Sequence, residues 1–417
     1  MSNHAEMTLT GGPAATIHTQ GVRDTASDRM PLYPEVGIIS PVLTMYGSRW
    51  TSRHQVLTRL ARYFHVLWIP PALEWRDTLR APRLNWREAH IPGQPESFAI
   101  HQAPSWLPLL YRPQRVARTF ARMRLNAARD ALRRRGCTRI VLYLWHLSFA
   151  DARDMVAHDL SIYHIYDEYS NAEVEQPLDP VEQQLIRSVD QVITVSPTMF
   201  ERKGRLNPHT ARLTNGVEFD AFATTVPEPS DLAHIPHPRL GYAGYIKKQL
   251  DWSLLLALAT RHPEWSFVFV GAMRPHPEIT PMLERMGALP NVHFLGSKTT
   301  AELARYPQHF DLCLMPYRVN DYSKYIYPLK LHEYLASGRP TVSVPIPAVA
   351  EVQNLVTVAD GVDEWEQAIA RELAPGADTS ARRAARQAMA RQHDWNTIVD
   401  QIAQLITERM PAARGAA

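Results

Sequence analysis

Two series of short apolar runs, each alternating with amphipathic helical segments, constrain the fold of this chain most strongly. Buried strands are expected at 36–43, 65–69, 139–145, 161–167 and 191–196, and again at 239–243, 266–272, 292–295, 311–316 and 341–344. Helices are expected at 50–64, 148–158, 179–189, 251–261, 300–306, 328–337, 362–373 and 379–410. Strands that alternate with helices form parallel sheets covered by helices on both faces. The sequence therefore predicts an α/β protein with two doubly wound, Rossmann-like domains that face a cleft.

A proline-rich segment separates the two series. Residues 223–238 contain four prolines and little apolar periodicity, so we expect a linker there. The flanking domains are expected at 31–222 and 239–390. Residues 1–30 are polar and lack the apolar core of a signal peptide, and we interpret them as a disordered leader.

Composition excludes several classes of protein. No apolar run approaches the roughly 20 residues that a membrane-spanning helix needs. The formal charge of +3 is too small to indicate a nucleic-acid partner. The only two cysteines, Cys137 and Cys313, have no metal-binding spacing, no histidines pair at zinc spacing, and no Asp-x-Asp run suggests a divalent metal. These features predict a reduced, cytoplasmic protein without a metal or cofactor.

The segment Arg112–Arg135 is strongly basic. It contains nine arginines and a single acid, Asp130, and apolar residues recur between the arginines at helical spacing. One interpretation is a solvated outer helix that covers a sheet. The other is a surface attracted to anionic lipid headgroups, and the two are compatible because one face can pack while the other meets lipid.

A short helix with both ends marked is expected within residues 327–340. Pro328 suits the first helical turn, and Gly338 suits the position just past the last turn. Lys330 and Glu333 are three residues apart, so they share a face near the end of the helix that carries partial positive charge. A nucleoside diphosphate fits such a pair, with the lysine and the helix end on the phosphates and the glutamate on the ribose hydroxyls. The alternative is a capped surface helix with an internal ion pair.

This segment resembles the nucleotide-binding helix of GT-B glycosyltransferases. Glu333 matches the ribose-binding glutamate of that family, whereas Tyr325 stands eight residues earlier, where retaining members carry a second glutamate. The Pro-Leu-Lys-x-x-Glu-Tyr form around Leu329 resembles group 1 type transferases of exopolysaccharide, capsule and teichuronic acid assembly. In the xanthan glucuronosyltransferase, a lysine at the position of Lys330 contacts the nucleotide phosphates.

The resemblance covers nearly the whole chain and implies a function. It implies transfer of a sugar from a nucleotide sugar, expected to be a UDP-sugar, to a glycan or lipid-linked acceptor at the cytoplasmic face of a membrane, without a metal. It also implies that the segment 391–417 is a helix that crosses back to the first domain. The expected donor-binding residues are Gly244, Lys247, Lys248, Tyr325, Leu329, Lys330 and Glu333.

Asp167 and Glu168 stand at the carboxyl end of an expected strand of the first domain, where a catalytic loop should lie. An inverting transfer needs a base that takes a proton from the acceptor hydroxyl. Asp167 matches the position of the general base in the xanthan enzyme. The adjacent Glu168 is the alternative candidate for this role. Alternatively, Asp167 caps the following turn.

Two turns at expected strand ends complete the candidate site. Between the first strand and the first helix, Gly47, Trp50, Arg53 and His54 are expected to contact the acceptor, although Arg53 could instead pair with a carboxylate of its own domain. After the first strand of the second domain, a glycine turn at Gly244 would admit the pyrophosphate, and Lys247 or Lys248 could neutralise it.

Two other functions are compatible with this fold. A nucleotide-sugar epimerase would need neither an acceptor nor a membrane face, and a nonenzymatic nucleotide-sugar binding protein would bind without turnover. The basic segment Arg112–Arg135 favours the transferase over the epimerase.

Overall fold

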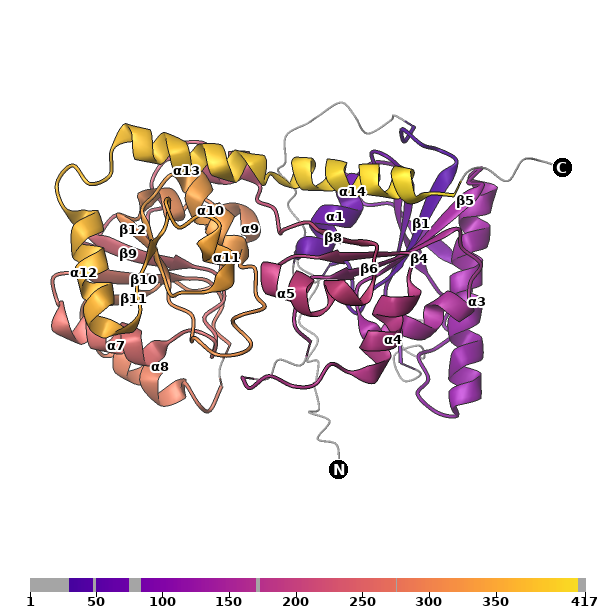
Figure 1. Ribbon diagram of the computed structural model, residues 1–417, viewed down its shortest axis with the longest axis horizontal. Coiled ribbons are helices and arrows are strands. Elements are labelled where there is room, and N and C mark those ends of the chain that lie inside the picture. The colour runs from indigo at the N-terminus through magenta and orange to yellow at the C-terminus, as the bar shows by residue number, and fades with distance from the viewer. Residues whose placement is uncertain (1–29, 48–49, 75–83, 170–172, 275, 412–417) are drawn as a thin grey trace.

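The computed structural model describes residues 30–47, 50–74, 84–169, 173–274 and 276–411. It contains two α/β domains, each built on its own sheet, and a helical C-terminal segment that connects them again (Figure 1). The expected leader lies outside the described residues except for Met30. Of the helices in the described ranges, none is both long and apolar enough to cross a bilayer.

The first domain holds an eight-stranded sheet with the order β3-β4-β2-β1-β5-β6-β7-β8. Its strands are β1 Val36–Pro41, β2 His65–Ile69, β3 Arg87–Ala89, β4 Phe98–Gln102, β5 Arg139–Leu144, β6 Leu160–Ile165, β7 Gln191–Thr194 and β8 Thr210–Arg212. All neighbours are parallel except β3 and β4. The five longer central strands were expected from the sequence. The edge strands β3 and β8, which are only three residues long, and β4 beside β3 are not expected from the sequence, because none of the three carries a long apolar run.

The helices of the first domain are α1 Ser52–Leu60, α3 Gln114–Arg134, α4 Pro180–Ser188 and α5 Pro197–Arg202, with the 3₁₀ segments η1 Leu147–Asp154 and η2 Gly204–Leu206. The expected α-helix at 148–158 is therefore wrong in type, since that segment forms the tighter η1. The basic helix α3 is present, and only its second half is buried, through Leu125, Ala128, Ala131 and Leu132.

The second domain holds a six-stranded, all-parallel sheet with the order β11-β10-β9-β12-β13-β14. The strands are β9 Arg239–Ala243, β10 Ser266–Val270, β11 Val292–Phe294, β12 Leu312–Met315, β13 Thr341–Ser343 and β14 Thr357–Val358. The helical segments are α6 Phe219–Ala223, α7 Trp252–Arg261, α8 Thr280–Gly287, α9 Thr300–Leu303, η3 Pro307–His309, α10 Leu329–Ser337, α11 Pro347–Ala350 and α12 Gly361–Leu373.

The helix expected at 379–410 is two helices, α13 Ser380–Gln392 and α14 Trp395–Arg409. The break falls at Asp394, whose side chain accepts hydrogen bonds from the backbone N–H groups of Asn396 and Phe219. As Figure 1 shows, α13 lies on the second domain and α14 on the first. The apolar face of α14, including Ile398 and Ile402, packs into the core of the first domain. The segment α13–α14 therefore packs against both domains and connects them a second time.

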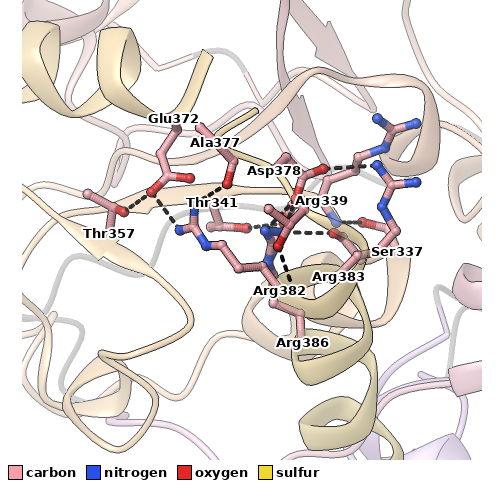
Figure 2. Close-up of polar contacts among 12 residues, drawn as sticks. Ser337, Arg339, Thr341, Thr357, Glu372, Ala377, Asp378, Arg382, Arg383 and Arg386 are labelled. Carbon is pink, nitrogen blue, oxygen red and sulfur yellow. Dashed lines mark hydrogen bonds and ion pairs between the residues drawn. The ribbon is translucent and has the colours of Figure 1, made fainter. Parts of the chain in front are cut away.

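A cluster of arginines fixes the end of α10 against α13 (Figure 2). The buried guanidinium of Arg386 donates to the carbonyl of Gly338 at 2.9 Å and to Asp378 Oδ1 at 2.6 Å. Gly338 has φ 74°, as its expected role past the helix end requires, and a Cβ there would collide with Arg383. The carbonyls at this end of α10 are thus satisfied by α13, and the helix is held at the end remote from the site.

Candidate active site

A cavity between the two domains encloses about 940 Å³ of empty space, its open mouth included. One wall is the beginning of α1, with Trp50, Thr51, Ser52 and Gln55, and α14 adds Trp395. The opposite wall consists of residues that follow the strands of the second domain and the beginning of α10. These are Gly244 and Tyr245 after β9, Gly271 and Ala272 after β10, Ser297 and Lys298 after β11, and Leu329, Lys330 and Glu333. Ligand sites of doubly wound sheets lie at this carboxyl edge.

The beginning of α10 points at the cavity. Pro328 is the residue just before the helix rather than its first helical residue, so Lys330 and Glu333 are its second and fifth residues. Both line the cavity, as their shared face predicts. The partial positive charge at a helix start and the charge of a lysine together favour an anion at this position.

The glycine turn after β9 lies directly under Lys330. Gly244 has φ 138°, and a Cβ at this position would collide with Lys330 Nζ. The Nζ atom also lies 4.9 Å from the centre of the Tyr242 ring, in cation–π geometry. Gly244 and Lys330 are 86 positions apart in sequence, and the fold brings them into contact. An anion bound to Lys330 would therefore also lie close to the backbone of the Gly244 turn.

The other expected donor-binding residues lie outside this cavity. Tyr325 is buried, and its hydroxyl donates to Glu175 at 3.0 Å and accepts from Arg202 at 3.0 Å, both in the first domain. Its assignment to the nucleotide is therefore corrected, and it is a contact between the domains. Lys248 forms an ion pair with Glu173 at 3.8 Å, also across the domains. Lys247 lies close enough to Asp167 to lower the pKa of that carboxyl.

Asp167 lies just after β6, at the boundary between the domains. Its Oδ1 accepts the Glu168 N–H at 2.9 Å and the hydroxyl of Tyr322 from the second domain at 3.1 Å. Burial raises the pKa of the Asp167 carboxyl, and these hydrogen bonds and Lys247 oppose that shift only in part. A carboxylate with a raised pKa is a better proton acceptor, which suits a general base.

Glu168 points away from the cleft into a buried ion-pair cluster. Lys203 Nζ lies 3.1 Å from Glu168 Oε2 and 3.0 Å from both carboxylate oxygens of Glu182. Tyr163 donates a further hydrogen bond to Glu182. Glu168 therefore has a structural role, which leaves Asp167 as the carboxylate of this pair that faces the second domain.

The residues expected to contact the acceptor have mostly structural roles. His54 is fully buried among Tyr46, Trp50 and Trp68. Its Nδ1 atom accepts a hydrogen bond from the backbone N–H of Thr51, just before α1. Burial lowers the pKa of His54 to about 4. Its acceptor-binding role is therefore wrong.

Arg53 is also buried, and its guanidinium donates to the Tyr166 hydroxyl at 2.7 Å. It pairs within its own domain, as the alternative interpretation predicts, but with a phenol rather than a carboxylate. Gly47 is exposed outside the cavity, and a Cβ there would meet nothing within 4 Å. Of this group, Trp50 alone lines the cavity.

Several cavity residues have no counterpart among those expected from the sequence. They include Tyr245, Gly271, Ser297, Lys298 and Phe222. Gly271 could have been found from the sequence, because a glycine directly after an apolar strand indicates that another backbone segment approaches closely. In the structure, a Cβ at Gly271 would collide with the carbonyl of Gly244. Tyr245, Ser297 and Lys298 lie in loops and Phe222 in the short helix α6, where the sequence carries no comparable pattern.

The chain is similar to known proteins in sequence and in fold. Residues 237–374 match the family model "Glycosyl transferases group 1". A Bacillus subtilis (strain 168) protein named for teichuronic acid biosynthesis, the glycosyltransferase TuaH, is 27% identical over 274 residues, which are 63% of this chain and 67% of TuaH.

Solved structures share the fold over most of the chain. Sucrose-phosphate synthase from Thermosynechococcus elongatus matches with a TM-score of 0.63 and 16% identity, covering 89% of this chain and 98% of that one. HepE from Anabaena, solved in complex with UDP and glucose, matches with a TM-score of 0.61 and 15% identity, covering 89% and 99%. The fold is GT-B, as expected from the sequence. The fold, the family match over residues 237–374 and the similarity to TuaH together support a GT-B glycosyltransferase.

Proposed function

We propose that this glycosyltransferase moves a hexosyl group from a UDP-sugar to a glycan or lipid-linked glycan acceptor in the assembly of a cell-surface polysaccharide. The observation that carries the donor assignment is the position of Lys330 above the Gly244 turn, beside Glu333, in a cavity between the domains. The similarity to TuaH, named for teichuronic acid biosynthesis, and to HepE, solved with UDP and glucose, supports the choice of donor and pathway.

The donor would lie along the beginning of α10. Lys330 and the helix N–H groups would stabilise the diphosphate as it departs, since that is where negative charge develops. Glu333 would accept hydrogen bonds from the ribose hydroxyls. Because these groups supply the positive charge at the leaving group, we propose that the reaction needs no divalent metal.

Asp167 would act as the base in an inverting transfer. As the acceptor hydroxyl attacks the anomeric carbon, its proton passes to the Asp167 carboxylate, and the bond from that carbon to the diphosphate breaks. The raised pKa of Asp167 and its place at the domain boundary support this role. Closure of the domains would keep out water, which competes as an acceptor.

Calorimetric titration with UDP, GDP, ADP and TDP tests the donor proposal. We expect selective micromolar binding of UDP. If Glu333 holds the ribose, 2′-deoxy-UDP should bind more weakly than UDP, and Glu333→Ala should bring the two affinities together. Absence of binding to all four nucleotides would contradict the donor site. Selective binding of another nucleotide would mean that the donor sugar is carried by that nucleotide instead of UDP.

The first half of α3 would bring the enzyme to the cytoplasmic face of a membrane. Arg115 and Arg122 are exposed there, with Val116 39% and Met123 40% exposed beside them. Just before the helix, Tyr111 is 72% exposed. Basic residues attract anionic headgroups, and aromatic residues favour the interface between lipid and water.

Vesicle sedimentation tests this surface. The double variant Arg115→Gln/Arg122→Gln is expected to lose about 2 kcal/mol of binding to phosphatidylglycerol vesicles, roughly a 30-fold change in partitioning, at about 1 kcal/mol per basic residue. The exposed pair Arg285→Gln/Arg371→Gln on the second domain removes the same charge and should bind like the unaltered protein. Equal losses from both pairs, or no vesicle binding at all, would leave α3 as an outer helix that covers the sheet.

A further inference from the structure

The loop of the second domain between β12 and α10 reaches across to Asp167. Tyr322, in this loop, is only 9% exposed and donates its hydroxyl to Asp167 Oδ1 at 3.1 Å. The backbone N–H of Glu168 donates to the same oxygen at 2.9 Å. Among the described residues, no hydrogen bond is formed to Oδ2, so both donors hold the carboxylate by the same oxygen, Oδ1.

We propose that Tyr322 is a positioning residue that orients the Asp167 base from the donor-binding domain. The proposal rests on the proposed function, in which Asp167 takes the acceptor proton. A carboxylate held by one donor from the neighbouring backbone can still rotate, and a second donor on the same oxygen removes that freedom. Because the second donor belongs to the other domain, the base is fully oriented only when the two domains are in contact.

Contacts on both sides hold this loop against the first domain. The backbone N–H of Glu175 donates to Asp321 at 2.9 Å, and Arg318 lies 3.4 Å from Glu173. Tyr325, three residues after Tyr322, bonds to Glu175. The Tyr322 hydroxyl is therefore delivered by a loop anchored at several points, not by a side chain that swings freely.

Tyr322 itself is not the base. Its burial and the neighbouring carboxylates keep its pKa above that of an ordinary phenol, so it stays a donor at neutral pH. Its hydrogen bond favours the ionised form of Asp167, as do Lys247 and the Glu168 N–H, whereas the charge of the Glu168 carboxylate disfavours that form. Removing the hydroxyl should therefore shift the protonation of Asp167 in a known direction, which a packing role would not do.

Tyr322→Phe tests the proposal because it removes one oxygen and keeps the ring. We expect kcat to fall about tenfold or more, the range for a lost hydrogen bond to a charged group. Affinity for UDP should stay unchanged, and the acidic limb of the pH profile of kcat/KM should move to higher pH. The sign follows because the lost bond stabilised the carboxylate, so the pKa of Asp167 rises and the active ionised form disappears at a higher pH.

Tyr325→Phe is the matched control. It also removes a hydroxyl of the same loop that bonds across the domains, but that bond goes to Glu175 and Arg202 rather than to the base. The acidic limb should stay in place in this variant. An equal shift in both variants would mean general loosening of the domain contact and would overturn the positioning role, as would an unchanged limb in Tyr322→Phe. Should Asp167→Asn keep full activity, the base assignment itself would fail, whereas UDP binding tests the donor site separately.

Discussion

Lys330→Met is expected to weaken UDP binding about 10- to 150-fold. This corresponds to the 1.5–3 kcal/mol that a hydrogen bond to a charged group contributes. Methionine keeps the aliphatic stem that lies beside Tyr242 and above Gly244, so the cavity should keep its shape while losing the charge. Calorimetric titration of both proteins with UDP measures the difference.

Lys324→Met provides the control for that experiment. Lys324 precedes the same helix, is half exposed and pairs with Asp321. It does not line the cavity among the residues described there, so UDP affinity should be unchanged. An unchanged affinity in Lys330→Met would return α10 to the alternative interpretation of a capped surface helix.

Asp167→Asn is expected to reduce transfer by about 10²–10⁴-fold, the typical contribution of a general base, while UDP affinity stays the same. Asparagine has the same shape and can still accept the hydrogen bonds of Tyr322 and the Glu168 N–H. In the unaltered enzyme, activity should fall as the pH drops through the pKa of Asp167. Since burial raises that pKa, the fall should lie above the usual range near 3.9.

Glu168→Gln separates the two adjacent carboxylates. It leaves Lys203 with one charged partner instead of two in a buried cluster, so it should lower the thermal unfolding midpoint. The folded variant should still transfer sugar, because Glu168 faces away from the cleft. Initial rates with a UDP-sugar, measured below the unfolding transition, distinguish the two variants. Full activity of Asp167→Asn would remove Asp167 as the base.

The candidate site was partly readable from the sequence because some of its signals are local. The face shared by Lys330 and Glu333 follows from helical spacing, and the positive φ of Gly338 follows from its place after the last turn. The role of Tyr325 was misread because position alone does not tell which neighbour a side chain meets. Its hydroxyl bonds to Glu175 and Arg202, about 150 and 123 positions away.

Local sequence patterns were sufficient to predict most of the alternation of strands and helices, the two-domain architecture and the ends of α10, since these depend on residues a few positions apart. Packing between distant elements was needed to show which of Asp167 and Glu168 faces the other domain, that His54 is buried, and that Lys330 lies next to Gly244. Each of these depends on elements remote in sequence that pack against one another. The free energy of such contacts comes from burial and pairing with distant partners, which no local pattern encodes.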